Sequence, residues 1–193
     1  MFRQGPQGVP HRGRPGRRRP GTDGTDPGRI RKPLIAAVEG AAVAGGFELA
    51  LACDLVTAAD TAFFALPEVA RGLIAAEAGA VRLPGRLPHH LAMELLLTAA
   101  PLPAATAARY GLVNQLTSEG KALDAALALA ARVQAHSPQA VRVIKQIGQD
   151  THGLADRDTF AVQDPLSAPV FGTASAVEGS RAFTEQRPPR RSA

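Results

Sequence analysis

The sequence is poor in aromatic residues and in cysteine. Tryptophan is absent, aromatic residues make up 4% of the 193 positions, and Cys53 is the one thiol. A single cysteine excludes an internal disulfide framework and is typical of a protein in a reducing compartment. Cys53 lies in an apolar run, where a small, unreactive core residue is the expected role. We therefore expect a cytoplasmic location.

Uninterrupted apolar runs long enough to cross a membrane are also missing. The best candidate, residues 34–56, contains Glu39, Glu48 and Asp54, which are too many charges for a lipid-facing helix. The N-terminus is rich in arginine and proline and has no apolar centre, so it is unlike a signal peptide. We expect no membrane partner.

The net charge of +5 is unevenly distributed. Residues 1–32 hold nine Arg or Lys and two Asp, so this segment carries +7 and the rest of the chain −2. Residues 1–31 have no hydrophobic period and bury too little apolar surface to fold, so disorder is predicted. A basic arm binds polyanions, but this one has no interleaved aromatics and no recognisable nucleic-acid fold beside it. We expect no specific nucleic-acid partner, and we interpret residues 188–193 as a basic tail.

The remaining pattern places strands early and helices late. Apolar runs predict strands at 34–38, 55–59 and 62–65, with a turn at 60–61, and a strand or extended link at 112–116. Periodicity and the positions of Pro and Gly predict helices at 45–53, 75–83, 89–98, 103–110, 119–135, 138–148, 154–163 and 174–184. Ser118 is the expected N-cap of the 119–135 helix, whose expected apolar face is Leu123, Leu127, Ala130 and Val133. This order predicts one α/β domain with an α-helical C-terminal part.

Residues 34–54 contain the candidate chemistry. An apolar strand leads through a small-residue turn to Gly45 and Gly46, which begin a buried helix that contains Glu48. A glycine pair at a helix start leaves backbone N–H groups open to a ligand at the positive end of the helix dipole. Glu48 follows one turn later, so a donor for a developing oxyanion would lie beside a carboxylate able to move protons. The alternative is a packed strand–helix corner in which Glu48 pairs with a basic side chain.

Four segments of the sequence resemble the crotonase (enoyl-CoA hydratase/isomerase) superfamily. They are KPLIAAVEGAAVAGGFELALACDL, ALPEVARGLI, RYGLVNQL and EGSRAFTEQR, which follow one another in the family's order and spacing from residue 32 to residue 187. The resemblance implies the family's spiral of ββα units, incomplete here, over residues 32–118, and an α-helical region over residues 119–187. It also implies a homo-oligomer, either a trimer or a hexamer.

For matching positions, the resemblance implies a site for an acyl-CoA thioester. Gly45 matches one of the two backbone donors that polarise the thioester carbonyl in the family. The substrate would also contact Val43, Ala44 and Pro67. No cofactor and no metal are implied, because coenzyme A is part of the substrate.

The resemblance also gives a catalytic role to two acids. Glu48 and Glu68 match the carboxylates that hold a water molecule and move its proton in the hydratases. Two nearby carboxylates in different environments can divide the roles of base and acid. The presence of both favours hydration of a 2-enoyl-CoA, as in fatty acid metabolism, over an isomerase or another acyl-CoA reaction. The alternatives are an ordinary surface acid for Glu68 and, for the chain, a non-catalytic remnant or assembly partner.

The sequence departs from the family pattern in three places. The motif Ala-Gly-x-Asp-Leu, which gives the family's other backbone donor, is absent, so we expect an N-terminally truncated chain with residues 1–31 read out of frame. Losing one donor typically costs about 3–4 kcal/mol, so impaired hydration is predicted. Residues 74–79 replace a glycine-rich loop, and Glu77 there either alters the acyl pocket or lies in solvent. Ala44 stands where glycine is common, a change that we expect the backbone to tolerate.

Overall fold

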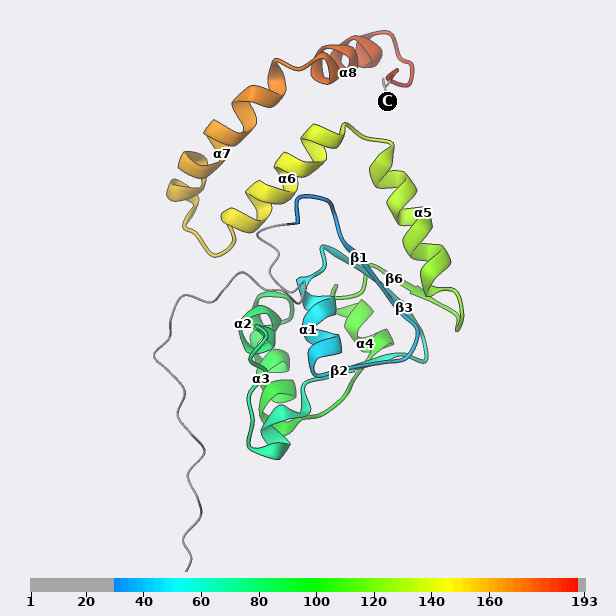
Figure 1. The fold of residues 1–193 in the computed structure, drawn as a ribbon, viewed down its shortest axis with the longest axis vertical. Coiled ribbons are helices and arrows are strands. Elements are labelled where there is room, and N and C mark those ends of the chain that lie inside the picture. Colours follow the sequence, from blue (N-terminus) through cyan, green and yellow to red (C-terminus); the bar gives the residue numbers. More distant parts are fainter. Residues whose placement is uncertain (1–29, 191–193) are drawn as a thin grey trace, which may run out of the picture.

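The computed structural model describes residues 30–190, except for the side chains of residues 156 and 157 (Figure 1). The predictions of disorder for residues 1–31 and of a basic tail at 188–193 therefore fall largely outside the described residues. Strands are confined to the first part of the described chain, and long helices make up the second part. This order confirms the predicted α/β domain followed by an α-helical region.

Two three-stranded sheets form the core. The first sheet contains the parallel strands β1 (Ile35–Val38), β3 (Leu55–Ala59) and β6 (Gln115–Thr117), in the order β1-β3-β6. The second sheet has the order β2-β4-β5, with β2 (Ala41–Val43) parallel to β4 (Phe63–Ala65) and β5 (Leu102–Pro103) antiparallel to it. The strands predicted at 55–59 and 62–65 are confirmed, but they belong to different sheets. The predicted turn before Gly45 is only partly confirmed, because Ala41, Ala42 and Val43 pair with β4 as strand β2 and a turn remains at Ala44.

Short helices surround the sheets, and longer helices follow. The short helices are α1 (Gly45–Ala52), the 3₁₀-helix η1 (Pro67–Arg71), α2 (Gly79–Arg82), the 3₁₀-helix η2 (Leu83–Gly85), α3 (His89–Thr98) and α4 (Ala104–Arg109). The later helices are α5 (Ala122–Gln134), α6 (Pro138–Asp150), α7 (Asp156–Phe171) and α8 (Ala174–Thr184). Helix α6 lies beside α7, and α7 and α8 lie on the side of α6 that is away from the sheets (Figure 1). Within residues 30–190, no helix is long and apolar enough to cross a membrane.

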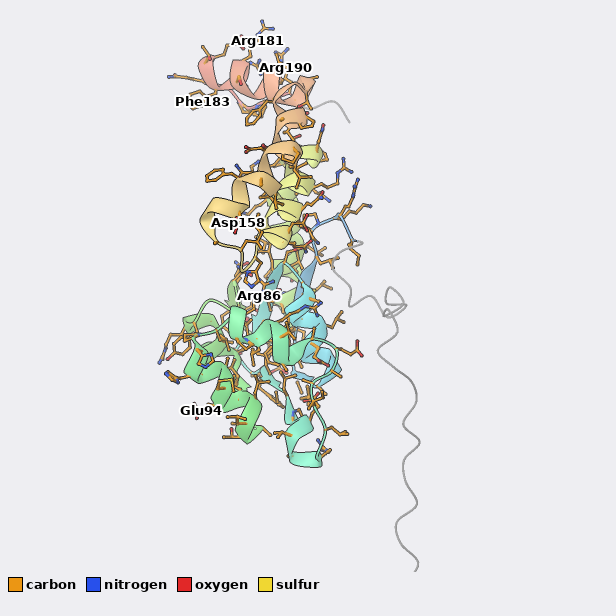
Figure 2. The ribbon with its side chains drawn as sticks, turned by 90° about the vertical axis from the view of Figure 1, so that its left-hand side faces the viewer. Arg86, Glu94, Asp158, Arg181, Phe183 and Arg190 are labelled. Carbon is orange, nitrogen blue, oxygen red and sulfur yellow. The ribbon has the colours of Figure 1, made fainter. Side chains whose placement is uncertain are left out.

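A few large side chains and many alanines fill the core. The rings of Phe47 in α1 and Phe64 in β4 pack with their centroids 5.0 Å apart, and both side chains are buried. Alanine side chains let the surrounding backbones approach closely, which fixes α1 against the second sheet. Side chains crowd between the sheets and the short helices, whereas Phe183 on α8 projects outward (Figure 2). The position of the N-terminus of α1 is therefore set by a packed core.

Polar contacts attach the start of α5 to the first sheet. The carboxylate of Glu39 accepts hydrogen bonds from the N–H groups of Gly120 (2.8 Å) and Ala122 (2.7 Å). The buried hydroxyl of Thr57 donates to the carbonyl of Ala122 (2.8 Å). The prediction of Ser118 as the N-cap is wrong, because Glu39 caps the helix from the end of β1 and the helix begins at Ala122.

The predicted apolar face of α5 is only partly confirmed. Ala130 and Val133 are half-buried, as expected, but Leu123 and Leu127 are exposed. Ala126 is buried instead, on the side of the helix that contacts β1 and β3. Close packing of a helix on a sheet favours a small side chain at the contact, so the larger leucines lie outside it.

A partly buried ion pair connects α6 to the sheets. The ammonium group of Lys145 lies 2.7 Å from Oδ2 of Asp54 and donates to the carbonyl of Lys32 (2.8 Å). Oδ2 of Asp54 also accepts the N–H of Leu34 (2.7 Å). Burial raises the pKa of the neighbouring Cys53 thiol, and the negative charge of Asp54 raises it further, so the thiol stays protonated. This agrees with the expected inert role of Cys53.

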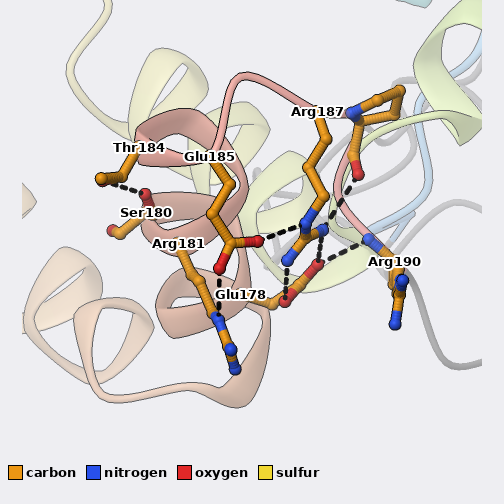
Figure 3. Close-up of polar contacts among 8 residues, drawn as sticks. Glu178, Ser180, Arg181, Thr184, Glu185, Arg187 and Arg190 are labelled. Atoms are coloured by element: carbon orange, nitrogen blue, oxygen red, sulfur yellow. Dashed lines mark hydrogen bonds and ion pairs between the residues drawn. The ribbon is translucent and has the colours of Figure 1, made fainter.

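A charged cluster folds the end of the described chain back onto α8 (Figure 3). The guanidinium of Arg187 donates to both carboxylate oxygens of Glu178, at 2.6 and 3.3 Å, and the N–H of Arg190 donates to the same carboxylate at 2.7 Å. Glu185 accepts from Nε of Arg181 (2.8 Å) and from Nε of Arg187 (2.6 Å). The carboxylate of Glu178 is therefore the centre of the cluster.

Acidification should release this chain end from α8. Hydrogen bonds from Arg187 and Arg190 lower the pKa of Glu178 from 4.5 to about 2. A carboxyl group with a lowered pKa in the folded state contributes stability above its ordinary pKa and loses it as the pH falls through the lowered value. We expect the NMR signal of the Arg190 amide to stay constant above about pH 4 and to change between about pH 3 and 1. In Glu178→Gln, this pH dependence should vanish; its persistence would exclude Glu178 as the cause.

Candidate active site

Two neighbouring strand ends supply the predicted site residues. Strands β2 and β4 are parallel, and Val43 pairs with Ala65, so their carboxyl ends meet at one edge of the second sheet. The N–H of Ala44 continues this pairing by donating to the carbonyl of Ala65 (2.9 Å). The chain after β2 enters α1 with Gly45 and Glu48, and the chain after β4 enters η1 with Pro67 and Glu68. The structure thus brings these segments to the same sheet edge.

The N-terminus of α1 is open to a ligand. Gly45 and Gly46 are exposed, and a Cβ added at Gly45 would meet nothing within 4 Å. The first bonds at this helix end are donated by the N–H groups of Phe47 and Glu48 to the carbonyl of Ala44. The N–H groups before them lie in the part of a helix that has no internal acceptors, at the positive end of its dipole. Gly45 therefore has the exposure that a donor to a bound oxygen requires.

Ala44, directly before α1, has a backbone conformation that favours glycine. Its φ is 53° and its ψ is −124°, a region in which the Cβ of an L-residue is crowded. The backbone accommodates alanine here, as expected, but such conformations typically cost of order 1–3 kcal/mol for a residue other than glycine. The chain retains the conformation because β2 on one side and α1 on the other both constrain it.

Replacing Ala44 with glycine should stabilise the fold. Relief of the backbone strain exceeds the entropy that glycine loses on folding, so the free energy of unfolding should rise by about 1 kcal/mol. Urea titration measures the change. The matched control is Ala41→Gly, because Ala41 is an exposed strand residue with a negative φ and should lose stability by about 0.5–1 kcal/mol. A loss in both variants would contradict strain at Ala44.

Glu48 is held inside the protein by a backbone amide. Its side chain is 3% exposed, and its Oε1 accepts the N–H of Gly79 at 2.8 Å. The alternative in which Glu48 pairs with a basic side chain is wrong, because the hydrogen-bond partner in the described part of the chain is this amide. A buried acid that is fixed in one position can act on a proton at a defined place.

Glu68 brings a second carboxyl group to the site. It is half-buried in η1, directly after Pro67, so it is not an ordinary surface acid. Its Oε2 is buried and has no hydrogen-bond partner among the described residues. A buried oxygen without a partner costs free energy, and such an atom marks a place where a water molecule or a ligand supplies the bond. Glu68 is therefore the described carboxyl group that most needs a partner from outside the chain.

The segment at 74–79 does not form the predicted start of a helix at Ala75. It is a turn that ends in Ala78, whose φ is 75°, and α2 begins only at Gly79. Glu77 is exposed, which agrees with a position in solvent rather than in an acyl pocket. Gly79 was not predicted as a site residue, and the signal for it in the sequence was the difference between residues 74–79 and the glycine-rich loop of the family.

The remaining predicted contact residues surround the same sheet edge. Val43 is exposed, and Ala44 and Pro67 are partly exposed, so each has surface that a ligand can reach. A groove of about 300 Å³ lies elsewhere, where the start of β1 meets α5 and α6. It is lined by none of the predicted site residues, so it is not part of this site. Among the residues that the structure describes, no group of three or more His, Cys, Asp and Glu is placed to hold a metal ion.

Known proteins that are similar to this chain in sequence belong to one family. The enoyl-CoA hydratase/isomerase family matches residues 28–192. Enoyl-CoA hydratase EchA19 of Mycobacterium tuberculosis is 38% identical over 161 residues, which are 83% of this chain and 60% of the relative. Carnitinyl-CoA dehydratase of Escherichia coli K12 is 36% identical over 164 residues, which are 83% of this chain and 63% of the relative.

Solved structures agree with these relatives. The crystal structure of an enoyl-CoA hydratase from Mycobacterium tuberculosis H37Rv is 51% identical to this chain, with a TM-score of 0.80 over 83% of this chain and 64% of that one. A structure of enoyl-CoA hydratase EchA1 from Mycobacterium marinum is 50% identical, with a TM-score of 0.80 over 83% of this chain and 66% of that one. The chain spans about three fifths of the length of the curated relatives it matches.

Proposed function

The chain belongs to the enoyl-CoA hydratase/isomerase family and has the crotonase fold, and we propose that its site adds water to a 2-enoyl-CoA thioester. The names of its relatives, a hydratase and a dehydratase of CoA esters, describe the two directions of one kind of reaction. The observation that supports the proposal is that the segments with Gly45 and Glu48 and with Glu68 follow two adjacent parallel strands, at one edge of the second sheet.

Gly45 would bind the thioester oxygen of the substrate. When water adds at C3 of a 2-enoyl thioester, negative charge develops on that oxygen, and a donor fixed in advance stabilises the charge. The exposed N–H at the start of α1 suits this role. Val43, Ala44 and Pro67 would contact the acyl group beside it. Coenzyme A is part of the substrate, so we propose no separate cofactor.

Glu48 and Glu68 would handle the water and its protons. One carboxylate takes a proton from the water while the oxygen bonds to C3, and the other carboxyl group delivers a proton to C2. The net change is the addition of one water molecule across the C2=C3 double bond. The buried, hydrogen-bonded Glu48 and the partnerless Oε2 of Glu68 support two different roles within one pair.

We propose that hydration by this chain is slow. The sequence contains no Ala-Gly-x-Asp-Leu segment, so the other backbone donor of the family is not supplied by that motif. Removal of one oxyanion donor lowers the rate by about 100–1000-fold in other enzymes. With one donor, the acid pair would still act on a bound enoyl thioester, but the charge on its oxygen would be less well stabilised.

A second candidate function is a non-catalytic assembly partner. Phe160, Phe171 and Phe183 are exposed on α7 and α8, and exposed aromatic side chains favour association. Assembly of copies into a trimer or hexamer through α7 and α8 would cover these aromatic side chains. Such an assembly is compatible with a role in fatty acid metabolism in the cytoplasm. An isomerase is less well supported, because both acids needed for hydration are present.

Incubation of the purified chain with crotonyl-CoA tests the proposed function. We expect a slow loss of enoyl absorbance that is first order in protein, together with elution from a sizing column as an oligomer. Turnover as fast as that of the longer hydratase relatives would contradict the proposed impairment. The absence of both turnover and crotonyl-CoA binding would favour the assembly partner.

A further inference from the structure

We propose that Gly79 is a positioning residue that fixes the carboxylate of the catalytic acid Glu48; the inference rests on the proposed hydration and deepens it. The N–H of Gly79 donates to Oε1 of Glu48 at 2.8 Å. Both residues are buried, although they are 31 positions apart in the chain. This hydrogen bond between α2 and α1 thus fixes where the carboxyl group of Glu48 lies.

The space beside Glu48 requires glycine at position 79. A Cβ at this position would lie 2.9 Å from Cγ of Glu48, 2.9 Å from Oε1 and 3.0 Å from Cβ of Ala75. Carbon atoms in contact prefer about 3.5–4.0 Å, so the Glu48 side chain would have to move. The φ of Gly79 is not in the left-handed region, so backbone conformation does not demand glycine here. The requirement comes from the closeness of the carboxyl group.

The turn before α2 aims this N–H group at Glu48. Ala78 adopts the left-handed conformation, with φ 75° and ψ 13°, and α2 starts directly after it. The carbonyl of Ala78 accepts the N–H of Arg82 (2.8 Å), so the turn and the helix form one unit. The N–H of Gly79 belongs to the first turn of α2 and has no acceptor within that helix, and Glu48 provides one. The contact therefore gives the first N–H group of α2 an acceptor and holds the carboxyl group of Glu48 in place.

Replacing Gly79 with alanine should lower kcat and leave KM almost unchanged. The added methyl group displaces the carboxyl group of Glu48, and a displacement of about 1 Å can reduce a rate about 100-fold. We therefore expect kcat for crotonyl-CoA hydration to fall about 10–100-fold. KM should change by less than about twofold, because Gly45, which would hold the thioester oxygen, is not contacted by this methyl group.

A double-mutant cycle on thermal stability supplies a readout that does not need turnover. Gly79→Ala should lower the melting temperature, and most of this loss should vanish in the Glu48→Ala background, where Cγ and Oε1 are gone. Gly85→Ala is the matched control, because its Cβ would meet the tip of the exposed His152 side chain at 2.8 Å and no atom of the site. Gly85→Ala should leave kcat unchanged, and its effect on the melting temperature should be the same with and without Glu48→Ala.

The outcomes separate this inference from the proposed function. Coupling in the cycle with a selective fall in kcat supports positioning by Gly79. Additive losses of melting temperature overturn it, as does coupling with an unchanged kcat, which would leave a purely structural contact. If the unsubstituted chain neither binds nor hydrates crotonyl-CoA, the proposed function fails, and the cycle alone still decides whether Gly79 fixes Glu48.

Discussion

Replacing Glu48 with glutamine should lower kcat for crotonyl-CoA hydration by about 10²–10⁴-fold, the usual contribution of a positioned acid or base. Glutamine has nearly the same shape, and its carbonyl oxygen can still accept the N–H of Gly79, so the fold should be preserved. The amide cannot take or give the proton that the reaction requires. KM should change little, because Gly45 and not Glu48 would hold the thioester oxygen. Steady-state kinetics measures both constants.

Two further variants make this expectation specific. Glu68→Gln should produce a loss of similar size, because both acids are needed to move the protons of one water molecule. Glu94→Gln is the control, because Glu94 is an exposed acid on α3 and should leave kcat unchanged (Figure 2). A Glu48→Gln variant with more than one third of the original kcat would show that Glu48 has no part in the chemistry.

Replacing Lys145 with methionine should lower the free energy of unfolding by about 3 kcal/mol. Its side chain is 6% exposed and forms the ion pair with Asp54, which is 23% exposed. Removing one partner of a buried pair leaves the other charge uncompensated, which typically costs about 3–5 kcal/mol. We expect a loss at the lower end of this range because Asp54 still accepts the N–H of Leu34 and is partly exposed to solvent. Urea unfolding monitored by circular dichroism measures the loss.

A surface pair in the same protein is the matched control. Lys121 lies 3.1 Å from Asp124, but both side chains are more than 60% exposed, so Lys121→Met should cost less than about 1 kcal/mol. Adding Asp54→Asn to Lys145→Met should recover part of the stability, because the lone charge is removed. Equal losses in the two lysine variants would contradict the importance of burial.

Local patterns in the sequence predicted several elements correctly. The helix at 89–98 and the one at 174–184 have the predicted bounds; proline precedes the first, and the hydroxyl of Thr173 caps the second. Helix α6 begins at Pro138, as predicted, and the hydroxyl of Ser137 before it accepts the N–H of Ala140. The residues that start a helix act within its first turn, so the start can be predicted from the neighbouring sequence alone.

Features that depend on distant residues could not be predicted. Strand β2 has three small residues and no alternating pattern, and it exists because β4 pairs with it. The bonds from Lys145 to Asp54 and from Gly79 to Glu48 join residues 91 and 31 positions apart. Periodicity predicted the roles of Leu123 and Leu127 wrongly, because it cannot show that a close contact with a sheet selects alanine.

The candidate site was predicted by resemblance more than by pattern. Gly45 at a helix start was visible in the sequence itself, and α1 begins at this residue, as predicted. Glu68 had no signal of its own beyond the family match, and its buried Oε2 appears only in three dimensions. The strain at Ala44 was also invisible, because backbone angles depend on how β2 and α1 constrain the residue between them.

The absorbance spectrum of a bound cinnamoyl-CoA tests the account most directly. This conjugated enoyl thioester absorbs at longer wavelength when its carbonyl oxygen accepts a hydrogen bond from a fixed donor. We predict such a shift on binding to the chain, and the same shift in Glu48→Gln, because the proposed donor is the N–H of Gly45. Cinnamoyl-CoA that is bound, as ultrafiltration can establish, but has an unshifted spectrum would contradict the proposed site.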